Sequence, residues 1–114
     1  MIKNRSKKTL LCEKHTIIED ILVMSIGLMF QRQVSEALVF RFRHPTRACL
    51  HMMFVFMPID IVLTDEQGTV LEVKENFRPF TIYNSSMKCR NIIEAKAGAV
   101  KESRTTPGDK LEFV

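Results

Sequence analysis

Alternation of apolar and polar side chains is the main pattern in the central part of the chain. Within the stretch SEALVFRFR, Leu38, Phe40 and Phe42 fall on one face of an extended segment, and Arg41 and Arg43 fall on the other. Similar short runs recur about every ten residues, and residues that favour turns separate them. The pattern predicts a mainly β fold, as a single-domain β-sandwich or a jelly-roll-like open barrel.

Several further segments have the composition of strands. Many are rich in β-branched and aromatic residues, and some are apolar on both faces, which fits the centre of a packed sheet. The expected strands are KKTLL (7–11), an extended piece within 12–18, ACLHMMFVFM (48–57), IDIVLTD (59–65), TVLEVKEN (69–76), CRNIIEAKAG (89–98) and LEFV (111–114). FRPFTIY (77–83) contains Pro79 and is expected at an edge or in a loop.

Breaks between the strands are predicted where proline or small polar residues interrupt the apolar runs. HPTR (44–47) is expected to be a turn because of its proline, and NSSMK (84–88) is expected to be a loop. Pro58 cannot donate to a β-ladder, so the chain is expected to bend or change partner there. These breaks predict that the long apolar stretches form several short strands.

Two short stretches have the chemistry of tight turns. DEQG is expected to close a hairpin, and TPGD is expected to form a type II turn. In each stretch the aspartate caps the turn and the glycine supplies the backbone angle. Asp65, Gly68, Gly108 and Asp109 are therefore assigned structural roles.

One short helix is expected near residues 20–30. Glu19 and Asp20 suit a helix start, and apolar residues then recur at helical spacing. Gly27 interrupts this pattern and is expected to end the helix early. The stretch AVKES is expected to form one further helical turn, and Gly98, directly before it, is assigned a structural role like that of Gly27.

The chain is mildly basic, with a net charge of +4 and a pI near 9.2. The first eight residues, MIKNRSKK, hold four of the 17 Lys and Arg, and the other 13 balance the 13 acidic residues. Residues 1–8 are therefore interpreted as a flexible basic arm, followed by a single β domain over residues 9–114. Such an arm could touch phosphate or acidic lipid, although a solvated terminus is the simpler interpretation.

Neither a membrane span nor a signal peptide is predicted. The apolar stretch IIEDILVMSIGLMF includes two acidic residues and is too short to cross a bilayer. The three cysteines, Cys12, Cys49 and Cys89, are odd in number and have no paired spacing. This favours a reduced setting over a disulfide framework, so a soluble, cytoplasmic protein is expected.

Asp60 and His51 are the candidate chemical groups of an otherwise apolar stretch. Strand alternation makes Asp60 half-buried, so its carboxylate needs hydrogen bonds or a cationic partner. It is expected to accept backbone N–H groups at the Pro58 bend, or to hold Arg41 or Arg90. The alternative is a ligand-binding or general-base carboxylate beside His51. A lone histidine here is more often a satisfied core or rim residue than a reactive one.

No pattern of metal ligands or of a known catalytic motif is present. Cys49 and His51 are one residue apart, but structural zinc needs four ligands in paired spacings, and the other Cys and His residues do not supply them. The sequence contains no G-x-S-x-G, Walker loop or H-E-x-x-H motif. No metal, cofactor or catalytic residue is therefore predicted.

The stretch RFRHPTR is the candidate anion-binding patch outside the arm. It gathers three arginines and a histidine around one expected turn. Phe40 and Phe42 alternate as core residues and are not expected to stack on bases, so nucleic acid is not the expected partner. A small anionic ligand, with Arg41, Arg43 or Arg90 at the rim of its cleft, is expected instead.

Five motifs, in order along nearly the whole chain, resemble a known family. They are GLMF (27–30), ALVFRF (37–42), PIDIVLTDEQGTV (58–70), IIEAKAG (92–98) and GDKLEF (108–113). On these motifs the chain is identified as a member of the DUF192 family, a family of uncharacterised domains, and it looks similar to archaeal-type members. The resemblance implies a small, mainly β, jelly-roll-like sandwich and brings no reaction or cofactor. Relatives often read W-M-K-N-T where this chain reads HMMFV, which weakens any binding role of that strand.

Three functional hypotheses follow. The first is a small non-enzymatic binding or interaction module with a cleft near the Pro58-Ile59-Asp60 strand. The second is an enzyme of unknown reaction that uses Asp60 and His51 as acid and base, which requires the two side chains to converge in an open pocket. The third is anion or nucleic-acid contact through the basic arm and residues 41–47. The sequence indicates no oligomeric state.

Overall fold

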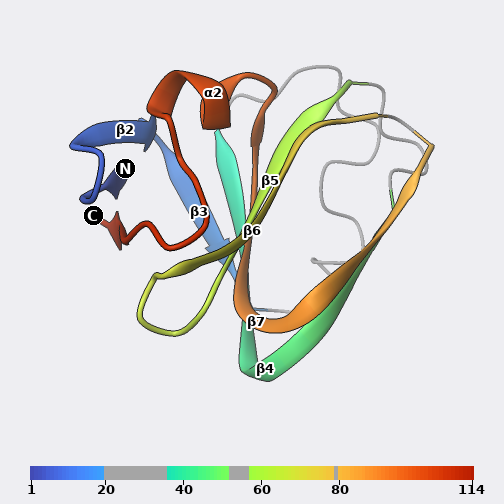
Figure 1. Cartoon of the computed structure of the whole chain (residues 1–114). Coiled ribbons are helices and arrows are strands. Elements are labelled where there is room, and N and C mark those ends of the chain that lie inside the picture. The colour runs from blue at the N-terminus through green and yellow to red at the C-terminus, as the bar shows by residue number, and fades with distance from the viewer. Residues whose placement is uncertain (20–35, 52–56, 79) are drawn as a thin grey trace.

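The computed structural model describes residues 1–19, 36–51, 57–78 and 80–114, with backbone only at residues 48, 50 and 51. The described chain folds into two β-sheets, and neither sheet closes into a barrel (Figure 1). One short helix follows the last strand of the larger sheet and precedes the last strand of the smaller sheet. The mainly β fold with two sheets that was predicted from the strand pattern is confirmed.

The smaller sheet joins the two ends of the chain. Its strand order is β2-β1-β8, with β1 at Ile2–Asn4, β2 at Thr9–Cys12 and β8 at Leu111–Phe113, all antiparallel. Ile2 and Asn4 are fully buried. A flexible arm over residues 1–8 is therefore not what the structure shows, because Ile2–Asn4 is the middle strand of a sheet.

The larger sheet has five strands in the order β3-β4-β7-β5-β6. All neighbours are antiparallel except β3 and β4, which are parallel. The strands are β3 (His15–Ile18), β4 (Ala37–His51), β5 (Ile59–Thr64), β6 (Val70–Phe77) and β7 (Ile82–Lys96). The expected strand IDIVLTD and its partner TVLEVKEN are confirmed as β5 and β6, and DEQG connects them.

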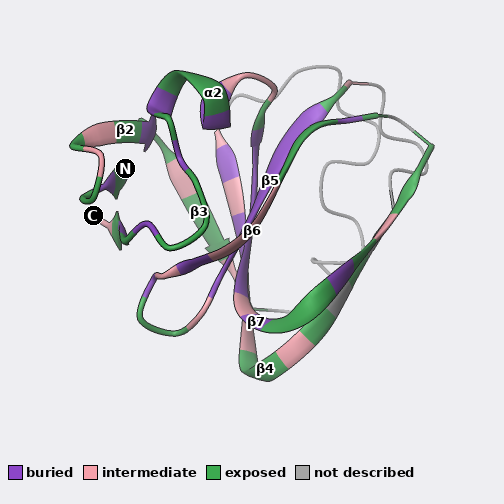
Figure 2. Cartoon of the chain, in the orientation of Figure 1, coloured by how far each residue is buried: buried purple, intermediate pink, exposed green. Residues whose placement is uncertain are grey.

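Apolar side chains cover both faces of the larger sheet. On one face, Val39, Val62 and Ile93 pack against Ile2 and the other buried residues of the smaller sheet. The opposite face has a second buried cluster, made of Phe40, Ile59, Ile61, Leu63, Phe77, Cys89 and Ile92. Every residue of β5 is consequently buried, as Figure 2 shows along this strand. Double-sided burial explains why β5 reads as a nearly continuous apolar run.

Strands β4 and β7 are each 15 residues long, and they correct two predictions. HPTR does not form a turn between two strands, and NSSMK is not a loop; both lie inside a strand. The register shows how the polar segments are accommodated, since residues 42–45 of β4 oppose Arg90 alone, and residues 85–87 of β7 oppose residue 48 alone. Bulges of this kind accept a proline and bend the strand without ending it.

The helical turn expected at AVKES is confirmed as α2 (Ala99–Ser103). Gly98, directly before it, has a φ of 98°. The helix expected near residues 20–30, with Gly27, lies outside the described residues. No helix in the described part of the chain is long and apolar enough to cross a membrane.

Candidate functional site

A groove of about 440 Å³ lies beside the β5–β6 hairpin, where the two sheets meet. Its walls come from β4, β7, the hairpin loop and β8. The lining residues are Arg41, Glu66, Gln67, Gly68, Arg90, Asn91, Leu111 and Phe113. The structure thus brings together Arg41 and Arg90, two of the three arginines that were expected at the rim of an anion site.

Arg41 is held from two sides. Its Nε–H donates to Oδ1 of Asn91 (2.9 Å), the residue directly opposite on β7. Its guanidinium carbon lies 5.6 Å from the centre of the Phe113 ring, in a cation–π arrangement. No described carboxylate forms an ion pair with Arg41. These contacts use Nε and one face of the guanidinium, and no contact with a described residue uses either of its two Nη groups.

The charge of Arg41 also affects its neighbour His15. The imidazole of His15 packs edge-on against Phe113, with 5.8 Å between the ring centres. Burial lowers the pKa of His15, and the positive charges of the amino terminus and Arg41 lower it further. A neutral imidazole at pH 7 follows, so His15 adds no positive charge beside the groove.

Arg90 occupies the outer wall of the groove. Its Nε–H donates to the carbonyl oxygen of Phe42 (2.9 Å), which fixes the base of the side chain. Its Nη1 donates to Oε2 of Glu66 (3.0 Å), a carboxylate that is mostly exposed to solvent. An exposed ion pair of this kind contributes little to stability, so an incoming anion can compete with Glu66 for Arg90.

The hairpin loop closes one side of the groove through Asp65 and Gly68. Asp65 Oδ1 accepts the backbone N–H groups of Gln67 and Thr69, both at 2.9 Å. Gly68 has a φ of 82°, and a Cβ at this position would lie 2.5 Å from the carbonyl oxygen of Leu111. The same backbone approach lets Leu111 N–H donate to Gly68 O at 2.8 Å. Glycine is therefore required for the hairpin to reach β8.

Asp60 lies away from this groove and is only 1% exposed. Its Oδ1 accepts the N–H of Asn76 (2.9 Å), and its Oδ2 accepts the N–H groups of Gly98 (3.0 Å) and Val100 (2.9 Å). The sequence predicts that the Asp60 carboxylate accepts backbone N–H groups. The donors, however, belong to β6 and the start of α2, and not to the Pro58 bend. No described arginine is paired with Asp60.

His51 does not lie near Asp60 along the sheet. On β7, His51 pairs with Ile82 and Asp60 pairs with Ala95, close to the two ends of this 15-residue strand. The side chain of His51 is outside the described part of the structure. Arg43 is exposed and does not line the groove. The groove lies beyond the Thr64 end of β5, at the opposite end from Pro58, near which a cleft was expected.

A second hollow, of about 250 Å³, lies nearer to the expected cleft. Two of its lining residues, Ala95 and Lys96, are the β7 partners of Asp60 and Ile59. Its floor consists of the buried residues Leu11, Ala37, Ala95 and Ala99, and its rim carries both lysines and glutamates. This mixed rim gives no preference for ligand charge, in contrast to the arginine-lined groove.

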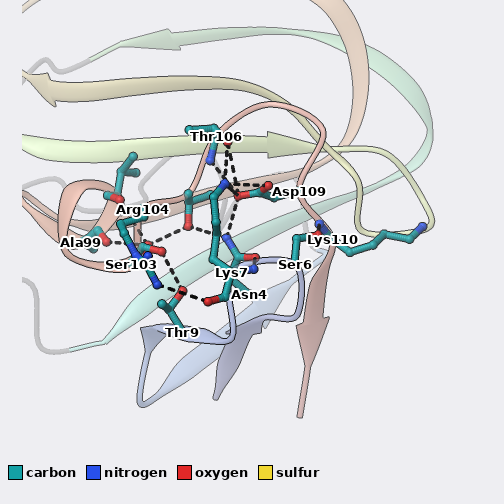
Figure 3. A network of polar contacts seen from close by, with 12 residues as sticks. Asn4, Ser6, Lys7, Thr9, Ala99, Ser103, Arg104, Thr106, Asp109 and Lys110 are labelled. Atoms are coloured by element: carbon teal, nitrogen blue, oxygen red, sulfur yellow. Dashed lines mark hydrogen bonds and ion pairs between the residues drawn. The ribbon is translucent and has the colours of Figure 1, made fainter.

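Asp109, near one end of the chain, is hydrogen-bonded to Asn4 and Lys7, near the other end (Figure 3). Its Oδ2 accepts hydrogen bonds from Asn4 Nδ2 (2.9 Å), Lys7 Nζ (2.8 Å) and Thr106 N–H (3.0 Å). Burial alone would raise the pKa of Asp109, but these hydrogen bonds and the charge of Lys7 lower it to about 2. Asp109 therefore does more than cap its own turn, which is the role expected from TPGD.

We expect Asp109→Asn to lower the free energy of unfolding by about 2 kcal/mol at pH 7, as the pKa difference from the unfolded chain implies. In the wild type this contribution is complete above about pH 4 and is lost as the pH falls toward the folded-state pKa of about 2. Urea unfolding between pH 2 and pH 7 measures both effects. The control is Glu112→Gln, whose carboxylate makes only an exposed ion pair with Arg5. If the free energy of unfolding fell equally with pH in Asp109→Asn and in the wild type, this role of Asp109 would be contradicted.

Glu94 is a buried titratable residue to which sequence reasoning assigns no role of its own. It pairs with Leu38 on β4 and Ile61 on β5, so the three side chains form a row on the face of the second apolar cluster. It is 8% exposed and has no hydrogen-bond or ion-pair partner among the described residues. Burial raises the pKa of Glu94 to about 7. Its position within the apolar run NIIEA is the sequence signal that could have identified Glu94 as a buried carboxyl.

The described residues contain no group of three or more His, Cys, Asp or Glu side chains that could hold a metal ion. All three cysteines are unpaired, with Cys89 buried and Cys49 exposed. Burial raises the pKa of the Cys89 thiol to about 11. A thiol with this pKa stays protonated at neutral pH and is a poor nucleophile.

Comparison with known proteins identifies the family. The family model DUF192, described as "Uncharacterized ACR", matches residues 4–113. The chain belongs to the DUF192 family. This chain is similar to UPF0127 proteins of Pyrococcus abyssi and Pyrococcus horikoshii, each 30% identical to it; the alignments cover 100% and 99% of this chain, and 97% and 98% of the relatives. The resemblance inferred from the five sequence motifs is confirmed.

Two crystal structures share the fold of this DUF192 protein. A Sinorhizobium meliloti protein, described as a candidate transcription regulator, has a TM-score of 0.81 and 27% identity over 86% of this chain and 79% of its own. A Novosphingobium aromaticivorans protein of unknown function has a TM-score of 0.80 and 22% identity over 87% of this chain and 74% of its own. The second similarity concerns the fold alone.

Proposed function

We propose that this DUF192 protein is a small non-enzymatic binding module that holds a small anionic ligand in the groove between Arg41 and Arg90. The observation that supports the proposal is the state of Arg41. Asn91 and Phe113 orient its guanidinium, and no described carboxylate neutralises it. A guanidinium that is already oriented binds a carboxylate or phosphate through two parallel hydrogen bonds with little further loss of entropy.

Other parts of the groove suit the same class of ligand. The Nδ2 of Asn91 already donates to Thr64 Oγ1 (3.2 Å), so its oxygen stays turned toward Arg41. Leu111 and Phe113 offer apolar surface to the body of the ligand. A cleft of a few hundred Å³ with a few convergent polar groups is typical of small-molecule sites.

An acid–base enzyme built on Asp60 is not favoured. Both carboxylate oxygens of Asp60 accept backbone N–H groups, and His51 pairs near the other end of β7. A general base has to reach a substrate proton, which a carboxylate enclosed by three backbone donors does not do. The unpaired cysteines fit a reducing compartment, so we also propose the cytoplasm as the location.

The test compares anion binding to the wild type, to Arg41→Gln and to Arg43→Gln. Binding is measured by calorimetry and by thermal shift at low salt. Inorganic phosphate, succinate, citrate and adenosine monophosphate serve as probes. At least one probe is expected to stabilise the wild type, by about 2.7 kcal/mol at a hundred times its Kd. Arg41→Gln is expected to weaken that binding about tenfold or more, because it removes a charge-assisted hydrogen bond.

Arg43→Gln is the matched control, since it removes the same charge two residues away but outside the groove. It is expected to bind the probe as the wild type does. The proposal would be contradicted if both variants bound the probe equally more weakly than the wild type does, or if the wild type bound none of the probes.

A further inference from the structure

The outer parts of β4 and β7 form a two-stranded ribbon beyond the rest of the sheet. Strand β5 pairs with β7 only from Asn91 to Lys96, whereas β4 continues along β7 as far as the pair His51 and Ile82. Residues 42–51 and 82–90 are named here the β4–β7 ribbon. Figure 1 shows the two strands running together away from β5, and Figure 2 shows mostly exposed and half-exposed residues along them.

The β4–β7 ribbon contains four basic side chains, Arg43, Arg47, Lys88 and Arg90, and no aspartate or glutamate. Outside it, the remaining 13 Lys and Arg balance the 13 acidic residues. Residues 1–8 have as many cations, but Lys7 is paired with Asp109, and Arg5 faces Glu112. Within the ribbon, Arg90 is paired with Glu66, and Arg43, Arg47 and Lys88 have no ion-pair partner among the described residues, so the ribbon carries a cluster of three unpaired cations.

The backbone of the ribbon presents these cations to solvent. Arg47 and Lys88 are directly opposite each other and consequently project from the same face. Arg43 and His44 lie in the bulge where four residues of β4 oppose one of β7. The side chains of Arg43, His44, Arg47 and Lys88 are exposed, and none of them forms an ion pair with a described residue, whereas Arg90 is half-buried and paired with Glu66.

We propose that the β4–β7 ribbon binds the phosphate backbone of duplex DNA. A two-stranded antiparallel ribbon fits the major groove, where its arginines and lysines can reach phosphates. Arg43 and Arg47 are four positions apart on one strand, so they follow a run of phosphates and do not enclose one small anion. Base stacking is not needed for such contacts, which removes the objection that Phe40 is buried in the core.

The test is binding of a fluorescent duplex of about 20 base pairs, measured by anisotropy from 50 to 200 mM salt. Arg43→Gln/Arg47→Gln/Lys88→Gln is compared with Lys3→Gln/Lys8→Gln/Lys101→Gln, which has the same net charge and alters exposed residues elsewhere. The ribbon variant is expected to bind at least about tenfold more weakly at 50 mM salt. Its salt slope is expected to fall by about 3, because each phosphate that the protein no longer neutralises lowers the slope by about 0.9. The control variant is expected to keep the wild-type slope.

Three outcomes would overturn the proposal. The first is no binding of the wild type to the duplex at 50 mM salt. The second is equal weakening in both triple variants, which would mean that only net charge matters. The third is stronger binding to phosphatidylserine vesicles than to duplex at equal charge concentration. Arg41→Gln is expected to bind the duplex normally, which separates this proposal from the anion groove, and matching thermal midpoints of the two triple variants exclude misfolding.

Discussion

Asp60→Ala is expected to lower the free energy of unfolding by about 3 to 5 kcal/mol, because it leaves buried backbone donors without an acceptor. The carboxylate of Asp60 accepts the N–H groups of Asn76, Gly98 and Val100, and so joins β5 to β6 and to the start of α2. Alanine offers no acceptor to any of the three. Urea unfolding at pH 7 measures the loss as a lower midpoint at unchanged slope.

Two further variants sharpen this measurement. Asp60→Asn keeps one acceptor oxygen and is expected to lie between the wild type and Asp60→Ala. Glu75→Ala removes an exposed carboxylate from the neighbouring strand β6 and is expected to change stability by less than about 0.5 kcal/mol. A loss of less than about 1 kcal/mol in Asp60→Ala would show that these contacts are weak, and would reopen a ligand role for Asp60.

Glu94→Gln is expected to be more stable than the wild type at pH 8, by up to about 3 kcal/mol. Burial raises the pKa of Glu94 from 4.5 to about 7. Between these pH values the folded protein holds a proton that the unfolded chain has released. Wild-type stability therefore falls by about 1.4 kcal/mol for each pH unit over this range, and glutamine, which cannot ionise, removes that loss.

Urea unfolding of both proteins at pH 4, 6 and 8 measures this effect as a difference that grows with pH. At pH 4 the carboxyl of Glu94 is neutral in both states, and the two proteins are expected to be nearly equally stable. Glu75→Gln, with an exposed carboxyl, is expected to show no such trend. A Glu94→Gln protein that is less stable than the wild type at pH 8 would mean that the Glu94 carboxylate has a cationic partner.

Local chemistry explains which parts of the fold the sequence predicts. The DEQG hairpin depends on contacts within five residues, namely Asp65 accepting the N–H groups of Gln67 and Thr69 and Gly68 taking a positive φ. Strands β5 and β6 follow from the apolar patterns on either side of this hairpin. AVKES likewise forms its helical turn next to Gly98.

The long strands β4 and β7 cannot be predicted in the same way. Pro45 and the polar run at 84–88 are genuine turn signals, and the pairing of two distant segments overrides them by bulging each strand once. Strand β1 is short, and its partners come from elsewhere in the chain. A three-residue strand that contains one lysine and is followed by Arg5, Lys7 and Lys8 resembles a solvated terminus until those partners are known.

The candidate site is predictable only in part for the same reason. Arg41 and Arg90 can be named as ligands for an anion because arginine suits that chemistry. Their convergence depends on the register between β4 and β7, and the orientation of Arg41 depends on Asn91 and Phe113, which no local motif connects. Asp60 is similar, since its need for backbone donors is predictable but their origin in β6 and α2 is not.

The position of β1 in the middle of the smaller sheet has a consequence for how the chain folds. Ile2 pairs with Phe113, and Asn4 pairs with Leu111, so this sheet is complete only after β8 has been synthesised. Until then β1 and β2 form at most a short hairpin, and the apolar side chains of Ile2 and Leu11 lack part of their cover. Such non-local pairing slows folding and exposes the incomplete chain to aggregation. Removal of β8 therefore takes away one of the two neighbours of β1 and removes Leu111 from the cluster that covers Ile2.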